Sequence, residues 1–204
     1  MIPAQIERPN QLLVEGKEEQ LFFGKLIQCM GLSDIQIQPS GGKTKLSANL
    51  KALRNMPEFN EVVSLGIVRD ADTDPSGAFQ SVHDALGRAQ LPMPSASLLP
   101  AGTNPRVVVL ILPAGDRTGA LEDLCLEAVA GDPAMPCVKG FFDCLKEKSL
   151  CLPRDLEKAK VQAFLASRKE EGLRLGEAAE KGYWPWGSPA FDQIKEFLQL
   201  VVKP

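Results

Sequence analysis

Three aspartates at alternate positions follow an apolar run that the sequence predicts to be a buried strand. The run extends from Val62 to Arg69, and Asp70, Asp72 and Asp74 come directly after it. Because alternate residues of a strand point to the same side, we expect Asp70 and Asp72 to share a face about 6–7 Å apart, which suits one hydrated cation. Carboxylate oxygens are hard donors that favour Mg²⁺ or Mn²⁺ over Zn²⁺. The sequence therefore predicts a divalent-metal site after this strand.

A further carboxylate, Glu15, follows another short apolar run at residues 11–14 and opens a turn through Gly16 and Lys17. The helical periodicity of residues 18–30 makes this a strand, a turn and a helix. Since binding groups collect beyond the carboxyl ends of parallel strands, we expect Glu15 to lie beside the aspartates. Clustered carboxylates repel one another unless a cation neutralises them. Glu15 thus strengthens the metal hypothesis.

Basic residues and paired glycines between two predicted elements are suited to phosphate binding. The loop at residues 39–45 holds Gly41, Gly42, Lys43 and Lys45, and Arg69 ends the central apolar run. Backbone N–H groups around paired glycines approach a phosphate closely, and lysines neutralise it. The spacing is not that of a Walker A loop, so a plain basic turn is the alternative.

Two adjacent carboxylates, Glu122 and Asp123, fall in the first turn of a predicted helix that starts near Thr118. Negative charge is favourable there because of the helix dipole. Their position just after a strand also allows metal binding, and both interpretations stay open. A third interpretation needs no metal at all, because aspartates such as Asp74 commonly cap a following helix.

The elements that must position these residues alternate between strand and helix. Near-continuous hydrophobicity in the central strand, residues 62–69, indicates burial on both faces, as in a parallel sheet covered by helices, whereas residues 34–38 alternate like a half-exposed strand. From Asp132 onward the pattern becomes helical, apart from a polar connection at residues 172–182. We expect an α/β domain at residues 1–131, with a mostly parallel sheet flanked by helices, and a helical extension at residues 132–204 packed on it. The predicted strands are residues 11–14, 34–38, 62–69 and 107–113, and the predicted helices of the extension are residues 138–145, 155–168 and 190–202.

The composition is that of an ordinary globular protein. The 204 residues are 44% hydrophobic, and 23 Lys and Arg against 26 Asp and Glu give a net charge of −3. A nucleic-acid partner would therefore need a local basic patch. No apolar run approaches the ~18 residues that span a bilayer, and residues 1–5 lack a basic then apolar leader pattern. We expect a cytoplasmic protein with no membrane partner.

The five cysteines are odd in number and contain no Cys-x-x-Cys pair. Cys137, Cys144 and Cys151 follow one another at steps of seven, but the lone histidine, His83, adds no convincing metal ligand. We interpret the cysteines as reduced thiols that act as small buried hydrophobes.

The pairing of two of these motifs resembles a known family. The turn Glu15-Gly16-Lys17 after a strand, followed one strand–helix unit later by Asp70-x-Asp72-x-Asp74, resembles the Toprim domain of topoisomerases, primases and related nucleases. The resemblance covers residues 11–126. Residues 41–43 and 119–124 further resemble a small uncharacterised Toprim family close to the OLD (overcoming-lysogenisation-defect) nucleases.

The resemblance implies roles for the acidic residues. Glu15 would be the acid/base or metal-linked carboxylate, and Asp70 and Asp72 would be the primary Mg²⁺ ligands, with Asp74 in the same motif. In OLD-type nucleases a further acidic residue completes a second metal site.

For that second site the candidates here are Glu122 and Asp123. A later lysine that assists the transition state would be Lys158 or Lys160. The chain lacks a Walker A pattern, and its single tyrosine, Tyr183, gives no tyrosine-nucleophile domain.

The implied function is a Mg²⁺-dependent (or Mn²⁺-dependent) phosphodiester hydrolase that acts on nucleic acid, with two ions ~4 Å apart. Lys17, Lys43, Lys45 and Arg69 would neutralise the substrate phosphates. The alternative is a catalytically silent Toprim-like module that holds a metal or a nucleotide. A homodimer or a partner protein is left open.

Overall fold

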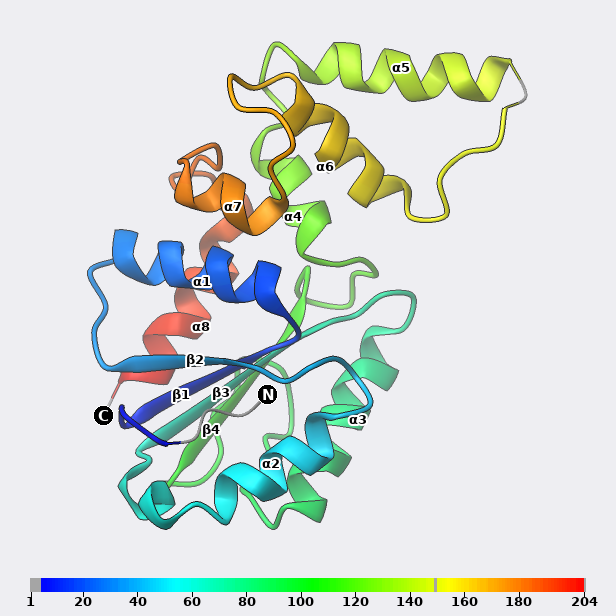
Figure 1. Cartoon of the computed structure of the whole chain (residues 1–204). Helices are drawn as coiled ribbons and strands as arrows, with labels where there is room; N and C mark the ends of the chain where they lie inside the picture. Colours follow the sequence, from blue (N-terminus) through cyan, green and yellow to red (C-terminus); the bar gives the residue numbers. More distant parts are fainter. Residues whose placement is uncertain (1–4, 149, 204) are drawn as a thin grey trace.

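The core of the protein is a sheet of four strands. The computed structural model describes residues 5–148 and 150–203. The sheet order is β2-β1-β3-β4, and each neighbouring pair is parallel (Figure 1). The predicted α/β class and parallel sheet are confirmed. The strands are β1 (Asn10–Val14), β2 (Ile35–Pro39), β3 (Ser64–Asp70) and β4 (Arg106–Leu112).

Helices cover both faces of the sheet, as predicted. Alternate strand residues point to opposite faces, so Leu13, Ile67 and Val109 enter one core while Leu12, Val68 and Val108 enter the other. The first core is closed by α2 (Leu46–Arg54) and α3 (Pro75–Arg88), with the short helix η1 (Pro57–Glu61) between them in the chain. The second core is closed by α1 (Lys17–Cys29), α4 (Leu121–Ala128) and the last helix, α8 (Asp192–Val202).

The segment after residue 132 is helical, as predicted. One of its helices lies on the sheet, and two others project beyond it. Helix α8 lies on the sheet, where a Cβ at Gly66 would come within 2.7 Å of Val201 Cγ2 and 2.9 Å of Phe197 Cζ. Helices α5 and α6 instead project beyond the sheet (Figure 1). No helix in the described ranges is both long and apolar enough to cross a membrane. The other elements of this segment are α5 (Met135–Glu147), α6 (Leu156–Ala166), α7 (Leu175–Glu180) and η2 (Pro189–Phe191).

The prediction of a polar connection at residues 172–182 is wrong, because this segment contains helix α7. This helix packs on α1 through small residues, and the Gly176 amide donates a hydrogen bond to Glu18 Oε2 at 2.9 Å. A Cβ at Gly176 would come within 2.5 Å of the Glu18 carbonyl oxygen. Small side chains bury against α1 without producing an apolar periodicity in the sequence.

The prediction that the cysteines are buried is also wrong for four of them. All five are free thiols, and only Cys125 is buried. The exposed ones are Cys29, Cys137, Cys144 and Cys151.

Candidate metal centre

Glu15 and Asp70 lie at the carboxyl ends of two neighbouring strands. In the register of β1 and β3, Leu13 is opposite Ile67, so Glu15 continues alongside the end of β3. Burial raises the pKa of Glu15, and the nearby backbone of Asp70 acts weakly in the opposite direction. The parallel topology therefore brings these two predicted site residues together.

Both carboxyl groups hold their protons more tightly than usual. Burial raises the pKa of Glu15, and nearby Lys43 and Arg69 act in the opposite direction. Burial raises the pKa of Asp70 to about 8, and the charges of Glu15, Glu19 and Glu122 add to the rise. The cluster thus carries excess negative charge in a partly buried place, which a cation would relieve.

Glu122 reaches the same cluster from the first turn of α4. Burial raises the pKa of Glu122, while Lys158 on α6 lowers it and Asp155 raises it. Lys160, the other predicted lysine, pairs with Glu157 at 3.3 Å on its own helix. Of the two lysine candidates, Lys158 is therefore the one that acts on the acidic cluster.

Glu19 was not predicted and belongs to the cluster. Its Oε2 accepts a hydrogen bond from the Gly16 amide at 2.9 Å, which fixes the start of α1. Its charge raises the pKa of Glu15, Asp70 and Glu122. The sequence signal was a glutamate three residues after the turn glycine, the position of the glutamate in a capping box.

Asp72 lies outside the strand, so the strand alternation from which we expected it to share a face with Asp70 does not reach it. Strand β3 ends at Asp70, and Asp72 has a left-handed φ of 50°. Its backbone exchanges two hydrogen bonds with Gly119, at 2.8 and 2.6 Å. The exposed side chain pairs with Lys43. Strand alternation therefore ceases before Asp72, and its carboxylate lies at the rim with a lysine.

Two other predicted ligands cap helices. Asp74 Oδ1 accepts a hydrogen bond from the Gly77 amide at 2.9 Å at the start of α3. Asp123 Oδ2 accepts one from the Ala120 amide at 2.8 Å at the start of α4. The capping interpretation accounts for these two carboxylates. Asp70 Oδ1 likewise accepts a hydrogen bond from the Leu121 amide at the start of α4, at 3.2 Å, whereas Glu122 needs another explanation.

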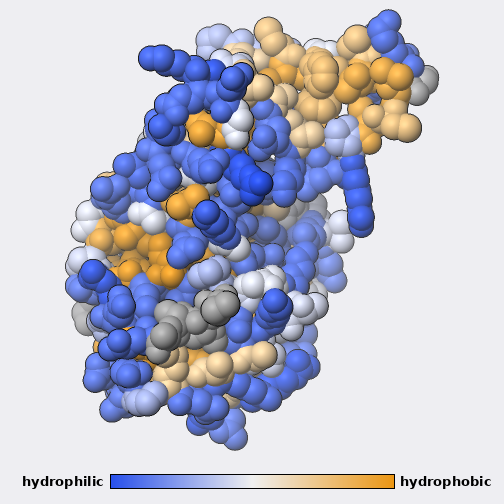
Figure 2. All heavy atoms as spheres, viewed as in Figure 1, coloured by the Kyte–Doolittle hydropathy of each residue, from blue (hydrophilic) through white to orange (hydrophobic). Residues whose placement is uncertain are grey.

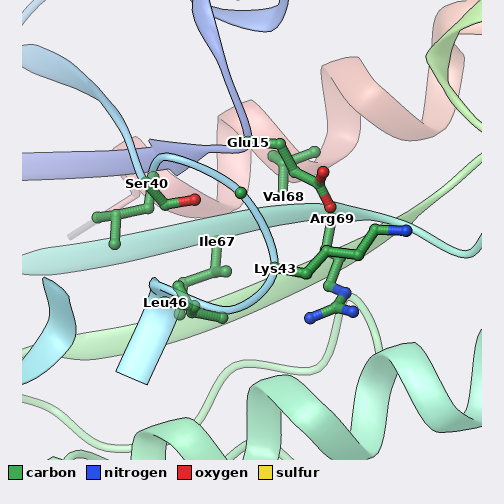
Figure 3. A pocket seen from close by; sticks show the side chains of 9 residues that line it. Glu15, Ser40, Lys43, Leu46, Ile67, Val68 and Arg69 are labelled. Carbon is green, nitrogen blue, oxygen red and sulfur yellow. The ribbon is translucent and has the colours of Figure 1, made fainter. Parts of the chain in front are cut away.

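The glycine-lysine loop lies over Glu15 but its amides are engaged. Gly41 has φ 72° and Gly42 has φ 92°, and both amides donate to the Glu15 carbonyl, at 3.1 and 3.2 Å. Glu15, Lys43 and Arg69 line the same small pocket under this loop (Figure 3). The two glycine amides are thus engaged within the protein, and Lys43 is the basic side chain that the loop brings to the pocket.

The other two predicted phosphate contacts lie further out. Lys45 precedes the first residue of α2 and is exposed. Lys17 is the exposed first residue of α1. Neither is among the residues that line the pocket beside Glu15.

Two buried polar atoms in this pocket have no hydrogen-bond partner, Glu15 Oε1 and Arg69 Nε. Buried polar atoms are nearly always hydrogen-bonded, so a small polar ligand or an ion fits beside Glu15. The carboxylate donors present suit Mg²⁺ or Mn²⁺. Among residues 5–148 and 150–203, no three His, Cys, Asp or Glu side chains lie close enough together to form a metal-ligand group.

Comparisons with known proteins place the chain in a family. No curated protein and no solved structure matches it. A family model described as "Protein of unknown function (DUF3226)" matches residues 9–203, nearly the whole chain. The chain belongs to the DUF3226 family.

Proposed function

We propose that this protein is a Mg²⁺-dependent phosphodiester hydrolase of Toprim type that acts on nucleic acid. The observation that carries the proposal is the pair of partly buried carboxylates, Glu15 and Asp70, at adjacent strand ends. Both have raised pKa values, and Glu15 Oε1 has no hydrogen-bond partner. Such a pair is costly in the folded state unless a proton or a cation neutralises it.

Glu15 and Asp70 would hold the ion. Mg²⁺ is commonly bound by one or two carboxylates, with waters and substrate phosphates as the remaining ligands. When bound, the ion supplies an activated water and neutralises charge on the phosphodiester. Glu122 is the candidate carboxylate for a second ion, because it belongs to the same electrostatic cluster.

The chain supplies both a base and cations for this reaction. A carboxylate beside the ion can also orient or deprotonate the attacking water, and Glu15 is the candidate for this role. Lys43 and Arg69 lie beside Glu15 and would bind substrate phosphate oxygens. Lys158 would act on the side of Glu122.

An open cleft of about 520 Å³ lies beside the cluster. Its charged lining is mostly acidic, which suits a cation, and consists of Asp72, Glu122, Asp123, Arg154, Asp155 and Glu157. The Toprim resemblance supports nucleic acid as the substrate class. The free thiols fit a reducing compartment, and we place the protein in the cytoplasm.

The second candidate is a silent module that binds a metal or a nucleotide without hydrolysis. The pairing of Lys43 with Asp72 favours it, since that lysine is then engaged within the protein. Cleavage assays separate the two candidates.

The test is a nuclease panel of DNA and RNA with Mg²⁺ or Mn²⁺, on wild type, Glu15→Gln and Asp70→Asn. We expect cleavage by the wild type and a loss of at least about 100-fold in both variants. Asp74→Asn is the matched control, because an asparagine still caps α3. If the wild type binds Mn²⁺ but cleaves no substrate, and Asp70→Asn abolishes that binding, the silent module is the remaining candidate. Wild-type protein that binds neither Mn²⁺ nor a nucleotide would refute both.

A further inference from the structure

Lys43 is the cation that the glycine-lysine loop brings to the acidic strand ends. Its ammonium group pairs with the Asp72 carboxylate. The same side chain lines the small pocket with Glu15 and Arg69 (Figure 3). Burial raises the pKa of Glu15, and Lys43 is the foremost of the charges that oppose this rise. One ammonium group therefore acts on two carboxylates, Glu15 and Asp72.

The backbone on both sides of this ion pair is held in place, whereas the charged groups are not. The two glycine amides before Lys43 donate to the Glu15 carbonyl oxygen, at 3.1 and 3.2 Å. The Asp72 backbone exchanges two hydrogen bonds with Gly119, at 2.8 and 2.6 Å. The Lys43 ammonium group is carried on a long flexible stem. The ion pair can therefore open and close by rotation of side chains alone.

The pair is exposed to water, and water weakens it. The side chains of Lys43 and Asp72 are 42% and 47% exposed. The hydrophobic surface that Figure 2 shows over α5 and α6 lies at the other end of the molecule from α2, the helix that this loop precedes. An exposed ion pair typically shifts an equilibrium by no more than about fivefold. A divalent cation, which coordinates carboxylate oxygens directly, is therefore able to replace the ammonium group.

Asp72 lies where a cation in the acidic cleft would meet it. Asp72 and Glu122 both line this cleft. The chain just before Glu122 contacts both aspartates, since it hydrogen-bonds the Asp72 backbone and donates an amide hydrogen bond to Asp70 Oδ1 at 3.2 Å. A cation at these carboxylates therefore competes with the Lys43 ammonium group for Asp72.

We propose that Lys43 is the resident counter-cation of Asp72 and that a divalent cation displaces it. In the metal-free protein the ammonium group neutralises Asp72. After displacement it is free to bind a phosphate oxygen of the substrate beside Arg69, so that the phosphate binds after the metal. This exchange rests on the metal site of the proposed function but not on hydrolysis, because a silent module would use it in the same way.

Titration of the full chain with Mn²⁺, followed by calorimetry, tests the displacement. Lys43→Met should bind Mn²⁺ about two- to fivefold more tightly than the wild type, because no ammonium group competes for Asp72. Lys45→Met is the matched control, since it removes the same charge from the same loop, but Lys45 is exposed and does not line the pocket beside Glu15. Its effect should be smaller, because salt screens exposed charges. Equal effects of the two variants would overturn the exchange, and a wild type that binds no Mn²⁺ would refute both the exchange and the hydrolase.

The same comparison in an Asp72→Asn background separates displacement from a general effect of charge. Asparagine tolerates the left-handed φ of 50° at this position, so the backbone contacts with Gly119 should remain. Without the carboxylate, Lys43→Met should give no larger gain than Lys45→Met. A gain of the same size in both backgrounds would overturn the exchange. If Lys43→Met gains no affinity while the wild type binds Mn²⁺ and cleaves nucleic acid, the exchange is refuted and the proposed function stands.

Inorganic phosphate tests the order of binding. With saturating Mg²⁺, Lys43→Met should bind phosphate several-fold more weakly than the wild type, since the freed ammonium group is missing. With EDTA in place of Mg²⁺ the two proteins should bind phosphate equally weakly, because Lys43 is then held by Asp72. Equal affinities with Mg²⁺, or equal losses under both conditions, would refute the metal-first order.

Discussion

The backbone amide of Leu121 donates a hydrogen bond to Asp70 Oδ1 at 3.2 Å, which joins the end of β3 to the first turn of α4. This bond lowers the pKa of Asp70, but burial and three neighbouring carboxylates outweigh it and give a value of about 8. At neutral pH a proton therefore competes with a cation for this carboxyl group.

Metal binding should depend steeply on pH. Because Asp70 must lose its proton to bind a cation, the apparent Mn²⁺ affinity should rise by up to about tenfold per pH unit as the pH approaches 8, and then level off. Calorimetric titration in two buffers of different ionisation enthalpy should detect the proton that is released. An affinity that does not change with pH would contradict the competition.

The stability of the metal-free protein should fall as the pH rises. The folded pKa of Asp70, about 8, lies above the ordinary value of 3.8, so the folded state binds more protons between these values. The stabilising effect of that proton is complete below pH 3.8 and is lost as the pH rises through about 8. Urea unfolding in a chelator should show this decline.

Asp70→Asn is the variant that isolates this effect, because an amide does not titrate. Above pH 8 its free energy of unfolding should exceed that of the wild type by at least about 1 kcal/mol, which corresponds to a shift of one pKa unit. A decline of equal size in both proteins would assign the pH dependence to other groups, such as Glu15.

Asp74 should behave as a helix cap. Asp74→Ala removes the acceptor for the Gly77 amide and should cost about 1 kcal/mol of unfolding free energy, measured by urea denaturation. Asp74→Asn keeps an acceptor and should restore most of that stability. If Asp74→Asn lost metal affinity while remaining stable, Asp74 would be a ligand and the capping interpretation would be incomplete.

Gly66→Ala should test the packing of α8 on the sheet. The added methyl would enter the space of Val201 and Phe197, which overpacks the core and should lower the unfolding free energy by about 1–3 kcal/mol. Gly131→Ala is the control, because nothing lies within 4 Å of a Cβ there. Its effect on thermal unfolding should stay within about 0.5 kcal/mol. Equal effects at both glycines would mean that α8 does not pack as described.

The sheet and the meeting of Glu15 with Asp70 could be predicted from the sequence because both follow from local patterns. Buried parallel strands have continuous apolar runs, and their carboxyl ends must share an edge. The position of Asp72 could not be predicted in this way, since it depends on hydrogen bonds to Gly119, which is distant in sequence. Helix α7 was missed for the same reason, because Gly176 is held by Glu18, 158 residues away.

Capping and metal binding use the same residue types, so the sequence alone left both interpretations open for the acidic residues. Asp74 and Asp123 lie within reach of an amide three residues away, as caps do. Glu19 also caps its helix, yet it contributes to the electrostatics of Asp70. Only the three-dimensional structure shows whether a capping carboxylate also lies close enough to the site to affect its charge.

The contacts of α8 with the amino ends of the central strands affect how the protein folds during its synthesis. Ser64 Oγ lies 2.5 Å from the Val201 carbonyl oxygen, and Arg106 Nη2 donates to the Leu200 carbonyl at 2.6 Å. Because α8 comes last in the chain, the ribosome makes β1 to β4 long before this helix, which covers part of one sheet face. Until residue 201 has left the exit tunnel, the part of the apolar sheet face that α8 covers stays open, and exposed apolar surface of this kind favours aggregation.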